Sequence, residues 1–209
     1  MRKQPRVLVG RTALVSSILA PVLFIGSTFL AEQMYAGYNP ASQTISELAA
    51  LTAPTHVFMT VMFMCTSLCH IVTAGFSPGI GIPGRLALGL AGVATFMVAL
   101  FPLPSIEGTS IPHRISAMIG FILLAVWPVL GMRVGGTWPW IVRPWGAVTG
   151  TLIMGAACFW FLGVWSNQSL GYVGVVERLG GDLESTWPAI VMITLFVVQR
   201  RRSTSSLTS

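Results

Sequence analysis

Charged residues are scarce in this chain of 209 residues. Lys, Arg, Asp and Glu together make up 9% of it, against about 25% in a typical soluble domain. Hydrophobic residues supply 54%, so too few polar side chains remain to cover a surface in water. This composition excludes a soluble globular domain and predicts that most of the outer surface faces lipid. Cysteine is also rare, and no disulfide framework is expected because all three cysteines lie inside apolar stretches: Cys65, Cys69 and Cys158.

Familiar catalytic and ligand-binding motifs are absent as well. The sequence contains no nucleophile elbow, no His-Glu-x-x-His zinc helix and no glycine-rich phosphate loop. The net charge of +6 does not indicate a nucleic-acid partner, because the basic residues lie at the ends of apolar blocks. We therefore expect no metal, no cofactor and no nucleic acid, and no catalytic residue can be named from a motif.

Long apolar blocks are what the chain does contain. A bilayer core is crossed by about 20 apolar helical residues, and six blocks of that kind occur, at about 13–31, 55–75, 84–104, 113–133, 144–166 and 183–199. They predict an all-α polytopic membrane protein, a bundle of six transmembrane helices with short loops. The predicted organisation is a basic N-terminus (1–12), one six-helix domain (13–199) and a basic, Ser-rich tail (200–209), of which 203–209 are expected to be disordered. The first block has no small-x-small cleavage site, which favours an uncleaved signal anchor.

The charges are divided unequally by this topology. Ten of the twelve basic residues fall on the side of the two termini, which predicts cytoplasmic termini and a multi-pass protein of the cell membrane. All six acidic residues fall on the opposite side: Glu32, Glu47, Glu107, Glu177, Asp182 and Glu184. We therefore expect no charge at mid-membrane, which disfavours a transporter.

Three segments on the predicted outer side carry most of the polar chemistry, at 32–54, 101–114 and 167–187. The stretch "LGYVGVV" before Glu177 is apolar, so we expect a loop that folds over the end of the bundle and carries Glu177 and Arg178 inward. The candidate pocket comprises Ser46, Glu47, His56, Glu107, His113, Arg114, Glu177 and Arg178.

Several of these polar residues also fit helix caps. Thr44-Ile45-Ser46-Glu47 has the capping-box pattern, which predicts a short helix over about 45–53 that is ended by Pro54. Asp182 is expected to be the N-cap of the sixth span, and Thr109 or Ser110 that of the fourth. A capped helix is also a firm support for functional groups at Ser46 and Glu47.

The segments "YNPASQTISELAA", "FPLP" and "GVVERLG", together with His113, recur in that order in a known family. From about 12 to 199 the chain resembles the bacterial and archaeal membrane proteins grouped as domain of unknown function 998. That resemblance implies six membrane helices and no established activity. In the family an acidic residue often follows the Phe-Pro pair, whereas here Leu103 and Pro104 follow it and Glu107 is the nearest acid. A fainter likeness to the Frag1/DRAM/Sfk1 group implies lipid-related work by analogy.

Three functions of different classes fit this sequence. A lipid headgroup could bind in the outer pocket, with Arg178 pairing to its phosphate. A membrane hydrolase or acyl-transfer enzyme could use the same pocket, with Glu47 or His113 as general base. A redox subunit could hold one b-type haem between His56 and His113, with His70 unrelated.

A structural accessory subunit of an envelope complex is a fourth interpretation. The expected partners are membrane lipids, together with partner membrane proteins or further copies of the chain.

Overall fold

The computed structural model describes residues 7–205, and no strand occurs among them. Its long helices are α1 (Arg11–Met34), α3 (His56–Gly75), α4 (Ile82–Leu100), α5 (Ile111–Leu130), α6 (Pro144–Trp165) and α7 (Val173–Ser205). All six are long and apolar enough to cross a membrane. The prediction of an all-α, six-span membrane protein is therefore confirmed. The short elements are α2 (Ile45–Leu48), η1 (Trp140–Val142) and η2 (Gln168–Leu170).

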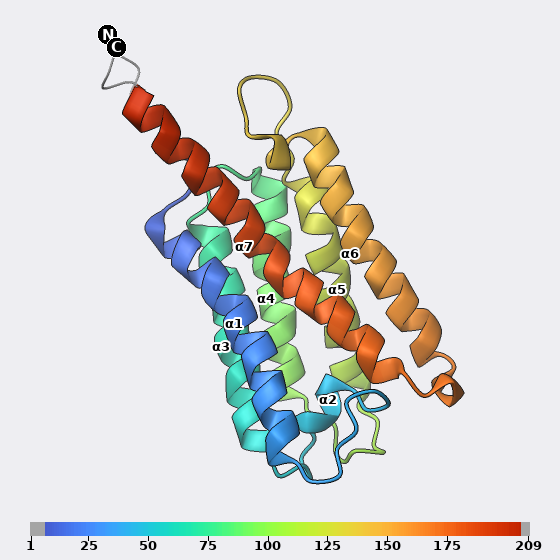
Figure 1. Cartoon of the computed structure of the whole chain (residues 1–209). Coiled ribbons are helices and arrows are strands. Elements are labelled where there is room, and N and C mark those ends of the chain that lie inside the picture. Colours follow the sequence, from blue (N-terminus) through green and yellow to red (C-terminus); the bar gives the residue numbers. More distant parts are fainter. Residues whose placement is uncertain (1–6, 206–209) are drawn as a thin grey trace.

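The six long helices form a closed ring in chain order (Figure 1). Each packs against the next, from α1 through α3, α4, α5 and α6 to α7, and α7 returns to pack against α1. The short helix α2 lies across one end of the ring, where it contacts α1 and α7. We call this the α2 end, and the opposite end, where α1 begins and α7 finishes, the termini end.

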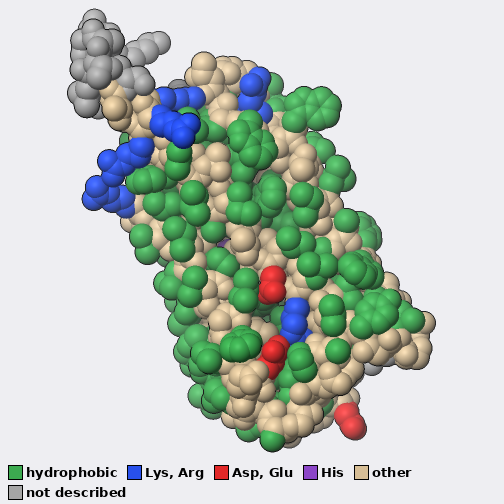
Figure 2. Space-filling view, in the orientation of Figure 1, with side chains coloured by type: hydrophobic (Ala, Val, Ile, Leu, Met, Phe, Trp, Pro, Cys, Tyr) green, Lys and Arg blue, Asp and Glu red, His purple; other side chains and the backbone are tan. Residues whose placement is uncertain are grey.

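The surface matches a protein embedded in lipid. Hydrophobic side chains cover the flank of the bundle, while most of the Arg side chains in view lie toward the termini end (Figure 2). Asp and Glu side chains on this face lie in the half nearer the α2 end. Inside the termini half, a core packs large apolar side chains that include Leu88, Trp127, Met192 and Leu195. Close approach there depends on glycine, because a Cβ at Gly84 would overlap the backbone of Gly131.

Helix α7 corrects the sequence prediction most clearly. It begins at Val173 rather than at about 183, so the expected outer loop over 167–187 is mostly helix. Asp182 lies inside α7 and is not an N-cap. The helix also continues to Ser205, so 203–205 are helical rather than disordered, whereas 1–6 and 206–209 lie outside the described residues. The predicted loop carrying Glu177 inward is therefore wrong in form, although Glu177 itself is buried.

Helix α2 confirms the capping box and corrects its length. The Glu47 carboxylate accepts from the backbone N–H of Thr44 at 3.2 Å and from its hydroxyl at 3.0 Å. The helix stops at Leu48, and turns lead from there to Thr55, whose hydroxyl donates to the Leu48 carbonyl at 2.7 Å. The predicted cap of α5 is confirmed at Ser110, whose hydroxyl accepts from the backbone N–H of His113.

Candidate functional site

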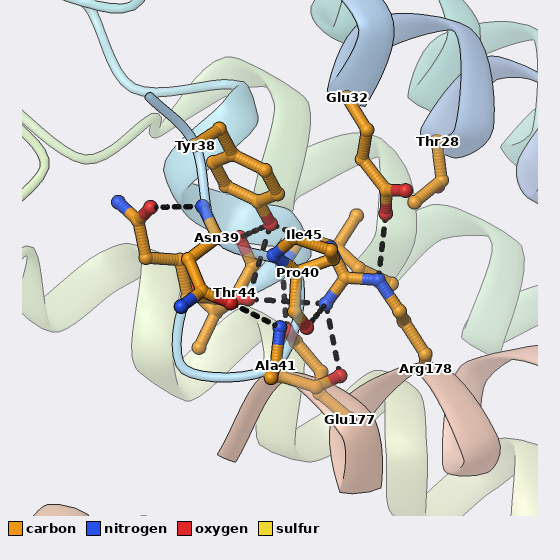
Figure 3. A network of polar contacts seen from close by, with 12 residues as sticks. Thr28, Glu32, Tyr38, Asn39, Pro40, Ala41, Thr44, Ile45, Glu177 and Arg178 are labelled. Atoms are coloured by element: carbon orange, nitrogen blue, oxygen red, sulfur yellow. Dashed lines mark hydrogen bonds and ion pairs between the residues drawn. The ribbon is translucent and has the colours of Figure 1, made fainter. Parts of the chain in front are cut away.

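Arg178 anchors a polar cluster at the α2 end (Figure 3). Its Nε donates to the Glu32 carboxylate at 2.7 Å, and one terminal nitrogen donates to the Tyr38 hydroxyl at 2.6 Å. The other terminal nitrogen donates to three carbonyls within 3.0 Å, those of Pro40, Gln43 and Gly174. Every guanidinium nitrogen is thus bonded inside the chain, so this arginine joins α7 to α1 and to the segment before α2. The pairing of Arg178 with a lipid phosphate that the sequence suggested stays a prediction, since the nitrogen bonded to Tyr38 carries a second N–H.

Glu177, next to Arg178, supports α2 directly. Its Oε2 accepts from the backbone N–H of Ile45 at 2.5 Å, and its side chain is buried (Figure 3). A carboxylate at the first turn of a helix satisfies N–H groups that have no partner within the helix. Glu177 and Glu47 therefore both hold α2 in place, from outside it and from within it.

Ser46 and His113 are hydrogen-bonded to each other at this end of the bundle. Nε2 of His113 lies 3.0 Å from Ser46 Oγ, and Nδ1 lies 3.0 Å from the carbonyl oxygen of Phe101. A carbonyl can only accept, so Nδ1 carries the proton and Nε2 of the neutral ring presents a lone pair to the serine hydroxyl. The imidazole is only 4% exposed. Nucleophile, base and orienting group thus follow one another, which is the arrangement that activates a serine.

A cavity of about 90 Å³ runs from this pair into the bundle. Ser46 and Glu177 line it at the α2 end, and His70 and Leu124 line it further in. Side chains from α1, α2, α3, α4, α5 and α7 contribute to its wall, which is mostly apolar and includes Phe24, Phe63 and Phe121. The helical ring therefore encloses space that begins beside the serine.

The inner part of this cavity contains a second polar group. Glu184 is 1% exposed, and its Oε1 accepts from the Cys158 thiol at 2.8 Å. It lies eleven residues after Val173, about 17 Å along α7 at 1.5 Å per residue. The expectation that no acidic residue enters the bundle is therefore wrong, because the earlier start of α7 moves this carboxyl group inward.

Other predicted pocket residues lie elsewhere. His56 bonds through Nδ1 to the Ala49 carbonyl at 2.7 Å, and Glu107 is exposed. Arg114 places its guanidinium over the Trp165 ring, 4.6 Å from the ring centroid. Of the predicted set, Ser46 and Glu177 line the cavity, and His113 joins them through Ser46.

Some residues of the site were not predicted from the sequence, both in the Arg178 cluster and in the cavity. Glu32 and Tyr38 complete the Arg178 cluster, and an arginine in so apolar a chain was the available signal that buried partners must exist. His70 and Glu184 were placed apart by the predicted spans, yet they line one cavity.

Metal and haem binding gain no added support. Within 7–205, no three His, Cys, Asp or Glu side chains are grouped so that they could hold a metal ion. Both ring nitrogens of His113 have partners inside the chain. The single haem between His56 and His113 therefore stays a prediction.

Comparison with known proteins gives one result at the level of the family. No curated protein and no solved structure matches the chain. The sequence profile of the family described as "Protein of unknown function (DUF998)" matches residues 18–194, which cover all six spans in whole or in part. The fainter likeness to the Frag1/DRAM/Sfk1 group stays a prediction. With most of its length matched, this integral membrane protein belongs to the DUF998 family.

Proposed function

We propose that this protein is a membrane enzyme of the acyl-transfer class, with Ser46 as nucleophile and His113 as general base. The observation that carries the proposal is the hydrogen-bonded series from Ser46 Oγ through the His113 ring to the Phe101 carbonyl, at 3.0 Å for each bond. The bias of basic residues toward the termini end supports an α2 end that faces away from the cytoplasm.

The chemistry follows from the tautomer of His113. Ser46 Oγ attacks the carbonyl carbon of an ester, and its proton passes to His113 Nε2. The tetrahedral adduct then breaks its bond to the alkoxy group, which leaves as an alcohol after taking the proton back from Nε2. The acyl group remains on Ser46 until water or a second alcohol attacks it in the same way. The Phe101 carbonyl holds the His113 ring in place while the protonated ring carries the positive charge.

The surroundings of Ser46 favour an amphiphilic substrate. The cavity beside it is walled largely by apolar side chains, and among the described residues no Lys or Arg lines it. An acyl chain is compatible with those walls, while a bare phosphate is not. We therefore propose a lipid or similar ester whose reacting carbonyl lies beside Ser46.

Binding without chemistry is the second candidate, and the same apolar lining favours it. The protein would then hold an amphiphile at the α2 end, and the bond between Ser46 and His113 would serve only to fasten α2 to α5.

The experiment is covalent labelling of the purified full-length protein with an alkyl fluorophosphonate, followed by peptide mass spectrometry. We expect modification of Ser46, its loss in Ser46→Ala, and at least about tenfold slower labelling in His113→Gln, since general-base catalysis contributes about 10²–10⁴-fold. The matched control is Ser116→Ala, which removes another serine of the cavity wall and should leave labelling unchanged.

Labelling that survives in Ser46→Ala would overturn the assignment of the nucleophile. An unlabelled protein that retains a lipid in native mass spectrometry would overturn the enzyme and leave the binding role.

A further inference from the structure

Three buried polar atoms in the inner part of the cavity have no hydrogen-bond partner. They are Oε2 of Glu184, Nδ1 of His70 and Oγ1 of Thr66. All three side chains line the cavity and are at most 2% exposed. A buried polar atom left unpaired is destabilising, so three around one space indicate that a polar occupant belongs there.

The three atoms come from two sides of the ring. Thr66 and His70 are four residues apart on α3, and therefore lie on the same face of that helix. Glu184 comes from α7, which lies on the other side of α1 in the ring. Residues of both groups line the same cavity.

The charge around this space is one-sided. Two carboxyl groups line the cavity, those of Glu177 and Glu184, and within residues 7–205 no Lys or Arg does. The Glu177 carboxyl group is already bonded to the backbone of Ile45 and Ser46, and Oε1 of Glu184 to Cys158, so of these oxygens Oε2 of Glu184 is the one left for an occupant. Phenyl rings complete the wall, and such rings also attract cations. The occupant that this environment favours carries positive charge.

We propose that the inner part of the cavity binds a primary ammonium group. Such a group presents three N–H donors, and Oε2 of ionised Glu184, Nδ1 of His70 with its proton on Nε2, and Oγ1 of Thr66 would supply three acceptors. The volume of about 90 Å³ suits a small amine. Two sources share this chemistry: a free amine, and the aminoalkyl headgroup of a lipid that enters from the α2 end. The site does not depend on the chemistry proposed for Ser46, because binding is measured without turnover.

The test uses the full-length protein in nanodiscs made only of phosphatidylcholine, titrated with ethylammonium chloride by calorimetry. We expect saturable binding that weakens at least about tenfold in Glu184→Gln, because a charge-assisted hydrogen bond is lost. Thr66→Val, which keeps the shape and removes the hydroxyl, should weaken binding about threefold to tenfold. Tetramethylammonium carries the same charge without N–H donors and should bind at least about tenfold more weakly than ethylammonium.

The matched control is Glu107→Gln, which removes one negative charge from an exposed position and should leave binding unchanged. Thermal unfolding of each variant shows that it is folded, and the isosteric Thr66→Val provides a second test if Glu184→Gln is not. Native mass spectrometry after exposure to phosphatidylethanolamine identifies the lipid source, and ethylammonium binding identifies the free amine; either result supports the site. Equal binding by Glu184→Gln and the parent, equal affinity for tetramethylammonium, or no binding of either amine source would overturn it.

Discussion

At the scale of single residues, Arg178 shows what a charged side chain does in a protein with few of them. Its side chain is 16% exposed and that of its partner Glu32 is 15% exposed, so the pair is screened little by water. The remaining donors go to Tyr38 and to three carbonyls, which only a forked guanidinium can reach together. The sequence indicated that Arg178 turns inward, but not that all its partners except Gly174 lie more than a hundred residues earlier.

Replacing Arg178 with lysine keeps the charge and removes the fork. We expect Arg178→Lys to lower the free energy of unfolding by about 1.5–3 kcal/mol, since hydrogen bonds of a charged group are lost while acceptors stay buried. The measurement is the free energy of unfolding of the variant and the parent in mixed micelles. Arg114→Lys is the matched control, because Arg114 is exposed and stacks on Trp165, and it should change stability by no more than about 0.5 kcal/mol. Equal effects of the two substitutions would contradict the structural role of Arg178.

Tyr38 in the same cluster predicts a dependence on alkaline pH. Burial raises the pKa of its hydroxyl above the ordinary value of 10.0, and the nearby Arg178 offsets this only in part. The unfolded chain therefore loses this proton near pH 10, while the folded protein keeps it. Stability from this group is fully present below about pH 10 and is lost as the pH rises beyond it.

The measurement is the free energy of unfolding between pH 8 and 11, a range chosen around the tyrosine value of about 10. Tyr38→Phe should flatten the decline at the alkaline end, whereas Tyr172→Phe, at an exposed position, should leave it as in the parent. An unchanged slope in Tyr38→Phe would show that another group causes the decline.

At the scale of elements, five of the six spans lie near their predicted positions, while α7 starts about ten residues early. Its first turns contain Gly174, Gly180 and Gly181 with three charged residues, a composition typical of a loop. They are helical in the fold because tertiary contacts favour it: Gly174 packs against the segment before α2, and Glu177 and Arg178 find partners there. Such contacts have no local signal. The same shift moved Glu184 into the cavity, which is why the inner site could not be predicted.

Two glycines of α7 test this explanation. A Cβ at Gly174 would overlap the carbonyl oxygens of Gln43 and Pro40, so Gly174→Ala should push the loop away from α7 and destabilise the protein by about 2 kcal/mol or more. At Gly180 the nearest atom to such a Cβ is 4.0 Å away, so Gly180→Ala should be neutral or stabilise the helix by up to about 1 kcal/mol. Thermal unfolding distinguishes them. A Gly174→Ala variant as stable as the parent would contradict the packing of the segment before α2 against α7.

At the scale of the whole molecule, the ring separates two kinds of surface. Helix α2 and its polar partners close one end, and most of the described basic residues lie toward the other. The sequence predicted six spans from apolar length alone, because crossing a bilayer constrains length and composition strongly. It could not predict that the spans close into a ring around a polar cavity, since that depends on which helices pack together. The access of any ligand then depends on which side of the membrane α2 faces.

Cysteine labelling in cells determines which side of the membrane α2 faces. Ser42 is exposed before α2, and Thr137 is exposed in the loop between α5 and α6 at the termini end. Because basic residues flank the termini end, we expect Ser42→Cys to react with a membrane-impermeant maleimide in intact cells, and Thr137→Cys only after the membrane is permeabilised. The parent chain supplies the background, since its three cysteines lie within α3 and α6. Labelling of Thr137→Cys alone in intact cells would invert the topology, and Ser46 and the cavity beside it would then be reached from the cytoplasm.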